Sequence, residues 1–153
     1  MTEVPIAHHE RDAVSFLRDY SVLQERLVTH FLTLYCPRDL ERFRDVPDSA
    51  LIVCGEEWRH RRHGRGVAFK HADGRVVNAH SGMAGSANAL DPGRVFEFAA
   101  SVGIHGLDYS GTRFATSYSG IRRLFWVLIT DGWLVRAEYT PGRFSGLYTL
   151  RDA

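Results

Sequence analysis

Histidine and basic side chains gather in one short stretch of this chain, residues 56–82, which reads EEWRHRRHGRGVAFKHADGRVVNAHSG. Four of the eight histidines and six of the nineteen lysine and arginine residues lie in it. Histidine titrates near neutral pH, and arginine presents a planar fork that matches carboxylates and phosphates. This His/Arg ribbon (residues 56–82) therefore predicts a surface for an anion, an acidic partner, a metal ion or proton transfer. The residues alone leave these alternatives open.

Acid–base catalysis is one alternative. His60, His63, His71 and His80 fall on three consecutive predicted strands, so hairpin pairing could bring two or three of them together. In a metal-independent phosphodiesterase or a biosynthetic enzyme, one histidine would accept a proton and a second would donate one. A basic side chain such as Arg59 would stabilise the developing negative charge. If the protein is an enzyme, His63 and His80 are the predicted catalytic pair.

A metal site and a cofactor site match the sequence poorly. On a strand, His60 and His63 fall on opposite faces, and no zinc-binding or HExxH pattern is present. The segment His63-Gly64-Arg65-Gly66 lacks the strand–turn–helix setting of a nucleotide fingerprint, so a hairpin turn or bulge is predicted there. We therefore expect neither a metal nor a cofactor.

Two groups of side chains are predicted to contact a ligand. In the ribbon they are Trp58, His60, Arg62, Arg65 and Lys70. In residues 104–118, a polar and glycine-rich segment predicted to be an irregular loop, they are His105, Asp108, Tyr109, Arg113 and Tyr118. Loops on rigid scaffolds often carry binding residues, which favours the second group.

Charge is distributed unevenly along the chain, although the net charge is only +1. Residues 1–57 carry an excess of five acids, whereas residues 58–75 carry six basic residues against Asp73 alone. Such a ribbon could bind nucleic acid, but an acidic segment packed beside it could neutralise it. Nucleic acid is therefore not favoured, and a protein partner or a small anionic ligand is predicted.

Hydrophobic periodicity predicts a helix over residues 9–35, ended by Pro37, with a short helical turn at 38–44. An apolar run at 51–54 is a first strand or its lead-in. In the ribbon, Trp58, His60 and Arg62 lie on one face of a strand. Strands follow at 67–71 and 75–80, joined at Asp73-Gly74.

The second half of the chain begins with a loop at 81–90 and a helix capped by Asp91 and Gly103. Ser119 is predicted to cap a third helix, 120–131, whose apolar run 124–129 would be buried on all sides. A hairpin of residues 133–139 and 144–150 closes the chain around Thr140-Pro141-Gly142.

These elements predict a two-layer α+β fold with an antiparallel sheet of about five strands. The sheet would be a three-stranded meander plus the C-terminal hairpin, packed by the long N-terminal helix and two later helices. Residues 1–153 would form a single domain, with a helical part at 1–47 and an α+β core at 55–150.

Compartment and redox state are predicted from what the sequence lacks. It shows no signal-peptide pattern and no apolar run long enough to span a bilayer, so a cytoplasmic protein without membrane contact is expected. Cys36 and Cys54 are then expected to be reduced and partly buried. The oligomeric state is left open.

One pattern resembles a known family. Its members are small uncharacterised bacterial domains in which a tryptophan strand runs into an HG-x-G turn, followed by a hairpin and a helix. Here the pattern is Trp58, His63-Gly64-x-Gly66, Phe69 and Asp73-Gly74, then Asp91-Pro92, Arg94 and Phe98. The resemblance covers roughly residues 55–150. Some such domains are encoded near polymorphic toxins, which implies an immunity or accessory role, but no catalytic residue transfers.

Two functions follow as alternatives. The favoured one is a small binding protein, immunity-like, that engages an anionic ligand or acidic partner through the His/Arg ribbon and residues 104–118. The other is a small enzyme with a histidine acid–base pair, which would need a shared cleft.

Overall fold

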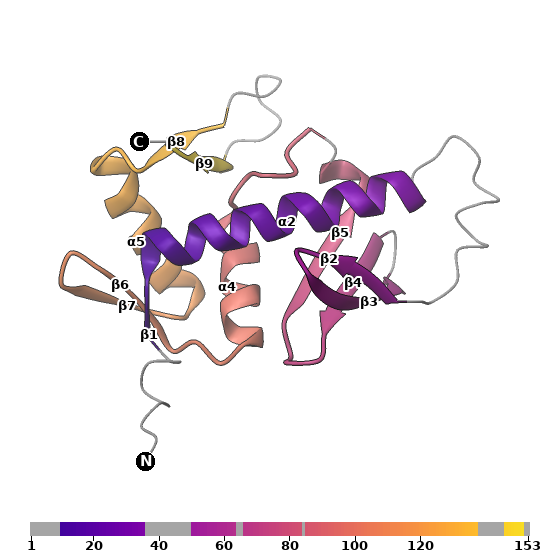
Figure 1. Ribbon diagram of the computed structural model, residues 1–153. Coiled ribbons are helices and arrows are strands. Elements are labelled where there is room, and N and C mark those ends of the chain that lie inside the picture. Colours follow the sequence, from indigo (N-terminus) through magenta and orange to yellow (C-terminus); the bar gives the residue numbers. More distant parts are fainter. Residues whose placement is uncertain (1–9, 36–49, 64–65, 84, 138–145, 152–153) are drawn as a thin grey trace, which may run out of the picture. The chain divides into compact units, whose positions relative to one another are not determined.

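The computed structural model describes residues 10–35, 50–63, 66–83, 85–137 and 146–151 (Figure 1). It has an α+β fold with mostly antiparallel sheets, which confirms the predicted fold class. The chain divides into two compact units, one of Met1–Ser21 with Ala89–Ala153 and one of Val22–Asn88. We describe each unit by itself, and the prediction of a single domain stays a prediction.

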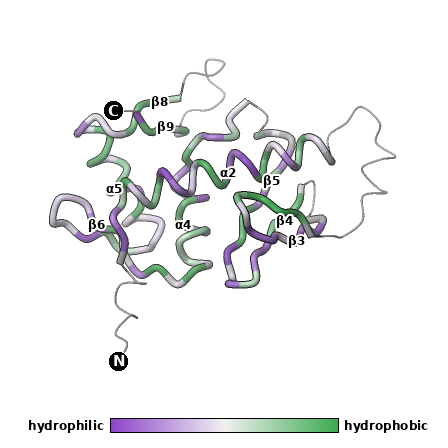
Figure 2. Tube along the Cα trace, viewed as in Figure 1, coloured by the Kyte–Doolittle hydropathy of each residue, from purple (hydrophilic) through white to green (hydrophobic). Residues whose placement is uncertain are grey.

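The longest element is the helix α2 (Ala13–Tyr35), inside which the division between the units falls. Asp12 starts it, because its Oδ1 accepts a hydrogen bond from the backbone N–H of Ser15 at 2.8 Å. Apolar and polar residues alternate along the helix (Figure 2), and Leu17, Leu27 and Phe31 are fully buried. The predicted helix is confirmed from residue 13 onward.

Residues predicted as the first helical turn instead form β1 (Glu10–Asp12). This strand pairs in parallel with β6 (Gly106–Tyr109), nearly a hundred residues later in the chain. The sequence window around residue 10 cannot reveal that partner, which is why the helix prediction began too early.

The second unit contains a four-stranded antiparallel sheet in the order β2-β3-β4-β5. Its strands are β2 (Ala50–Val53), β3 (Glu56–His63), β4 (Gly66–His71) and β5 (Val76–His80), followed by the short η1 (Ser81–Met83). The predicted meander is confirmed, and the apolar run at 51–54 supplies a fourth strand.

The β2–β3 connection is a two-residue turn formed by Cys54 and Gly55, which have φ values of +54° and +75°. Positive φ at both central residues is what a type I′ hairpin turn requires. The turn exposes Cys54, and its thiol is free. The expectation of a partly buried thiol was therefore wrong at this position, and Cys36 lies outside the described residues.

Strand β3 alternates between the two faces of the sheet. Trp58 and His60 are 0% and 1% exposed, whereas Arg59 and Arg61 face solvent. Phe69 lies directly opposite His60 and is also buried. The inner face therefore forms the core of this unit, together with the buried side of α2 from residue 22 onward.

In the first unit, α4 (Pro92–Ser101) begins and ends close to the predicted limits. The Asp91 side chain caps its N-terminus by accepting the Arg94 backbone N–H at 3.1 Å. Its ring residue Phe98 packs against Phe16 and Tyr20 of α2, at centroid distances of 5.9 and 4.7 Å.

Residues 104–118 do not form the irregular loop that was predicted. Most of them form a hairpin of β6 and β7 (Thr112–Ala115), turned by Ser110 and Gly111 with φ values of +50° and +79°. Leu107 and Phe114 lie opposite each other and are buried, so the hairpin has an apolar side. The segment reads as a loop because each strand has only four residues.

The helix α5 (Tyr118–Thr130) differs from its prediction in two ways. Ser117, not Ser119, is the N-cap, and its Oγ accepts the Gly120 N–H at 3.0 Å. The run at 124–129 is not buried on all sides, because Trp126 is 72% exposed. Leu124 and Leu128, one turn apart, are fully buried on the other side of the helix.

A C-terminal hairpin of β8 (Leu134–Arg136) and β9 (Tyr148–Leu150) is confirmed, but among the described residues it forms a two-stranded sheet of its own and does not join the meander in one sheet of about five strands. The predicted turn at 140–142 and the predicted helical turn at 38–44 lie outside the described residues, as do Gly64 and Arg65. Of the helices that the structure describes, none combines the length and the apolar character needed to cross a membrane.

Candidate functional site

The outer face of the sheet in the second unit carries three basic side chains. Arg59 and Lys70 are directly opposite each other on β3 and β4, and Arg61 is two residues further along β3. All three residues are exposed, and within the described part of the chain none of their side chains forms a hydrogen bond or an ion pair. We call these three residues the outer cationic face. Like charges in direct cross-strand opposition destabilise a sheet. Alternation also places the exposed Glu57 on this face, two residues before Arg59, and among the described residues it forms no ion pair with the three cations.

The predicted ligand residues of the ribbon lie on opposite faces of the sheet. Lys70 lies on the outer face, whereas Trp58 and His60 are enclosed on the inner face and offer no surface to an external ligand in this structure. The side chains of Arg62 and Arg65 lie outside what the structure describes. Arg59 and Arg61 were missing from the predicted ligand set. Strand alternation could have found them, because an inward Trp58 implies outward neighbours.

His63 and His80, the predicted catalytic pair, share one cross-strand row. The register pairs His63 with Gly66 and Gly66 with His80, so the two backbones lie two strand spacings apart, about 9–10 Å. His80 is exposed, and its Nδ1 accepts the Gly82 N–H at 3.1 Å. The His63 side chain lies outside the described part, so the catalytic pair stays a prediction.

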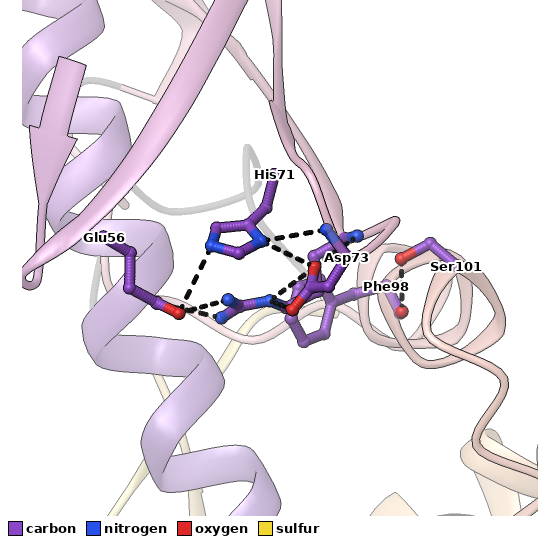
Figure 3. Close-up of polar contacts among 6 residues, drawn as sticks. Glu56, His71, Asp73, Phe98 and Ser101 are labelled. Atoms are coloured by element: carbon purple, nitrogen blue, oxygen red, sulfur yellow. Dashed lines mark hydrogen bonds and ion pairs between the residues drawn. The ribbon is translucent and has the colours of Figure 1, made fainter. Parts of the chain in front are cut away.

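A polar cluster that the sequence analysis missed surrounds the β4–β5 turn. We call Glu56, His71, Asp73 and Arg75 the Arg75 cluster. Figure 3 shows one guanidinium between the Glu56 and Asp73 carboxylates, with the His71 ring joined by dashed lines to both acids. Arg75 donates through Nη1 and Nη2 to the two Glu56 oxygens, the first at 3.1 Å, and through Nε to Asp73 Oδ2 at 2.8 Å. His71 lies between the acids: its Nδ1 accepts the Asp73 backbone N–H at 3.0 Å and is 2.9 Å from Asp73 Oδ1, and its Nε2 is 3.4 Å from Glu56 Oε2.

The cluster lies against the buried indole of Trp58. The Arg75 guanidinium carbon is 5.0 Å from the indole centroid, and the His71 ring meets the indole edge-on at 5.2 Å. Cation–π and edge-to-face contacts of this kind stabilise an aromatic core residue. The charged groups of the cluster mainly pair with one another, so the cluster holds the β4–β5 turn against the core.

The pKa values of Glu56, Asp73 and Arg75 are all shifted in the direction that favours the charged form of each side chain. The Arg75 hydrogen bond is the largest effect on Glu56 and lowers its pKa, against a smaller opposing effect of burial. Burial is the largest single effect on Asp73, but the Arg75 backbone N–H and the nearby positive charges outweigh it, so its pKa is also lowered. Burial likewise opposes the charge of Arg75, yet Glu56 and Asp73 together raise its pKa.

Replacing Arg75 with methionine is expected to lower the free energy of unfolding by about 1–2 kcal/mol at pH 7. The value lies between those for exposed and buried ion pairs, because the Glu56 and Asp73 side chains are 36% and 49% exposed and water screens them. A carboxylate with a lowered folded-state pKa stabilises the fold above its unfolded pKa, near 4, and loses this effect as pH falls through the folded value. The deficit of Arg75→Met should therefore shrink below about pH 4.

Urea unfolding from pH 7 to pH 3 measures this effect. Arg61→Met, which removes an exposed arginine without a partner in the described structure, is the matched control and should match the wild type. A deficit of Arg75→Met that stays constant down to pH 3 would contradict the assigned role of the carboxylates.

In the first unit, a hollow of about 420 Å³ is lined by Arg11, Asp12, Asp108, Gly111 and Arg113. Asp12, Asp108 and Arg113 are neighbours in one cross-strand row of β1, β6 and β7. The hollow therefore brings together two predicted ligand residues, Asp108 and Arg113. It also contains Arg11 and Asp12, which the sequence analysis did not select. Because two arginines face two aspartates, the hollow has no excess charge to favour an anion.

The other predicted residues of 104–118 are placed apart from this row. Tyr109 donates its hydroxyl to Asp131 Oδ2 at 2.5 Å, which raises the tyrosine pKa. His105 is exposed before β6, and Tyr118 is the first residue of α5. Among the residues that the structure describes, no group of three or more histidine, cysteine or acidic side chains could hold a metal ion.

Comparison with known protein families gives a match over most of the chain. Residues 13–150 match the model of the family described as Domain of unknown function (DUF6896), which is most of the chain. The chain belongs to this family. This confirms the resemblance to a family of small uncharacterised domains, whereas the implied immunity role stays a prediction.

Neither the curated proteins nor the solved structures contain a match to this chain. The family match extends over α2, the four-stranded sheet, α4 and α5, so it includes the outer cationic face and the Arg75 cluster. Since the family has no assigned activity, the choice among these sites rests on their geometry and charge.

Proposed function

We propose that this member of the family is a small binding protein that engages an acidic protein partner through the outer cationic face. The observation that carries the proposal is the direct opposition of Arg59 and Lys70, both exposed and both without a counter-ion in the described structure. This opposition costs stability in the free protein, and an acidic surface placed over it would remove the cost.

The spacing of the cations favours an extended partner over a small anion. Arg59 and Arg61 are about 7 Å apart along β3, and Lys70 is on the neighbouring strand. A phosphate is held best by donors that converge on one point, whereas three separate cations on an open face match several carboxylates. An immunity-like role, in which the partner is a toxin, is the more specific form of this proposal.

Nucleic acid is the less favoured partner. Trp58 and Phe69, two aromatic rings of this sheet, are fully buried on the opposite face, and single-stranded nucleic acid is bound largely by stacking on exposed rings. The enzyme alternative with His63 and His80 stays a prediction, because it needs a shared cleft that joins the two side chains.

Arg59→Glu tests the proposal through two opposite effects. The new carboxylate would face Lys70, so the free energy of unfolding should rise by about 0.2–1 kcal/mol. Affinity for a fluorescein-labelled oligoglutamate peptide, measured by anisotropy at low salt, should fall by about ten-fold. A change that stabilises the fold and weakens binding is what a functional cation predicts.

Arg26→Glu is the matched control, because Arg26 is an exposed arginine of α2 in the same unit and the net charge changes equally. It should leave affinity within about two-fold of the wild type. Equal weakening by both variants would reduce the effect to net charge and overturn the proposal. Tighter wild-type binding of oligouridylate RNA than of oligoglutamate would overturn the choice of a protein partner.

A further inference from the structure

A second exposed surface lies on the outward side of helix α5, in the first unit. The side chains on this side of the helix are not part of the core. The inward side of α5 carries Ile121, Leu124 and Leu128, all fully buried. Tyr118 and Trp126 are 50% and 72% exposed on the other side. The positions 118, 122 and 126 are four residues apart, so Tyr118, Arg122 and Trp126 form one line along the helix.

Among the described residues, the Trp126 side chain forms no hydrogen bond and no contact with another ring. An indole side chain can bury 150–250 Å² or so of surface, yet this one is mostly in water. Trp133, which follows the C-terminal end of α5, is half-buried and so differs from Trp126. A single exposed apolar residue is ordinary, but Tyr118 and Trp126 lie on the same side of one helix, and a patch of exposed aromatic residues marks a protein interface.

The neighbours of Trp126 strengthen this interpretation. The Arg122 guanidinium carbon is 5.6 Å from the Tyr118 ring centroid, so the two side chains order each other before any partner binds. Arg123 lies over the Phe114 ring at 5.8 Å. Tryptophan, tyrosine and arginine are the residue types most enriched at interface hot spots.

We propose that Tyr118, Arg122, Arg123 and Trp126, the α5 patch, dock a protein partner that offers an apolar pocket for the indole, rimmed by acidic side chains. Charge complementarity decides the chemistry of the rim. The patch holds two cations, and α5 contains no acidic residue from Tyr118 to Thr130. The inference does not depend on the outer cationic face, because that face lies on strands β3 and β4 of the second unit.

Other occupants match the patch less well. A membrane would gain little from one exposed indole and two cations, since stable interfacial helices bury a whole apolar face and α5 uses that face for its core. Single-stranded nucleic acid needs successive stacking rings, but Arg122 already covers Tyr118. A second copy of this patch would oppose arginine with arginine in a symmetric contact.

The test is selection of a phage-displayed library of random dodecapeptides on the immobilised full chain at physiological salt. Recovered peptides should combine acidic residues with an aromatic or aliphatic anchor. The best of them, synthesised and labelled, should bind the wild type in fluorescence anisotropy and bind Trp126→Ala at least ten-fold more weakly. Arg122→Glu/Arg123→Glu should weaken it similarly.

Two controls separate this site from the proposed function. Val135→Ala, at another exposed apolar residue of the same unit, should leave peptide affinity unchanged. Arg59→Glu should also leave it unchanged, while Trp126→Ala leaves oligoglutamate binding at the outer cationic face intact. Far-UV circular dichroism and a thermal melt verify that each variant is folded.

The proposal fails if no peptide is recovered, if the recovered peptides lack acidic residues, or if they bind Trp126→Ala as tightly as the wild type. It also fails if Trp126→Ala abolishes binding to phosphatidylserine vesicles or oligouridylate, or abolishes self-association in light scattering, while peptide binding is unaffected. Those results would assign the patch to a membrane, to nucleic acid or to a second copy of the chain.

Discussion

Replacing Trp58 with alanine is expected to lower the free energy of unfolding by about 3–5 kcal/mol. The side chain is 0% exposed, lies opposite His71 in the register and is covered by the Arg75 guanidinium. Truncation removes the ring from the core, leaves a cavity and deprives the Arg75 cluster of the surface on which it rests. Small domains have only about 5–15 kcal/mol of stability in total, so this loss is large.

Urea unfolding followed by circular dichroism measures the effect, and the chain contains its own control. Trp126→Ala makes the same chemical change at a site that is 72% exposed, so stability should stay within about 0.5 kcal/mol of the wild type. Equal losses for the two variants would contradict the assigned burial.

A milder variant keeps the prediction testable if Trp58→Ala does not fold. The Trp58 indole N–H is buried without a hydrogen-bond partner among the described residues. Trp58→Phe removes this unsatisfied donor while keeping a ring in place, so its loss of stability should be clearly smaller than that of alanine. A loss as large as that of alanine would mean that the indole N–H has a partner after all.

Gly120→Ala is expected to lower the free energy of unfolding by about 1–3 kcal/mol, the opposite of what helix propensity predicts. Alanine is preferred over glycine in helices by about 1 kcal/mol. Here, however, a Cβ on Gly120 would lie 2.2 Å from the backbone oxygen of Ala115 and 3.0 Å from its carbonyl carbon. Backbone atoms at the end of β7 cannot move aside cheaply, so the clash should outweigh the propensity gain.

Thermal unfolding measures this change, since about 1 kcal/mol shifts the melting temperature of a domain of this size by roughly 2–4 °C. Gly93→Ala is the control, because Gly93 also lies in the first turn of a helix. Its nearest neighbours would be Asp91 Oδ2 at 3.1 Å, the end of a side chain, and Tyr118 Cε1 at 3.8 Å. The control should melt near the wild type, and a Gly120→Ala variant more stable than the wild type would contradict the close approach.

Local signals predicted the elements whose causes are local. Asp91 with Pro92 fixed the start of α4 because a capping carboxylate and a prolyl ring act within one turn of the helix. Asp73-Gly74 located the β4–β5 turn for the same kind of reason, and Gly74 has a φ of +105°. The period of two in β3 placed Trp58 and Arg59 on different faces, because successive side chains of a strand point in opposite directions.

Long-range pairing was beyond the reach of these signals. The strand β1 exists because residues 10–12 find the edge of β6, and the Arg75 cluster exists because Glu56 and Arg75 meet from different strands. The same limit applied to α5, where an apolar run indicated a helix buried on all sides although Trp126 faces water. Exposure depends on which neighbours arrive, and a local window does not contain them.

The sequence by itself determined the fold class, the order of most helices and strands, and the concentration of positive charge in residues 56–82. These properties follow from hydrophobic period, capping and turn chemistry, which act over a few residues. Only the tertiary structure decided which charges of that ribbon are neutralised. Arg75 is paired with Glu56 and Asp73, whereas Arg59 and Lys70 oppose each other in the open. Strand register sets this difference, because a shift of one residue would exchange the two faces of the sheet.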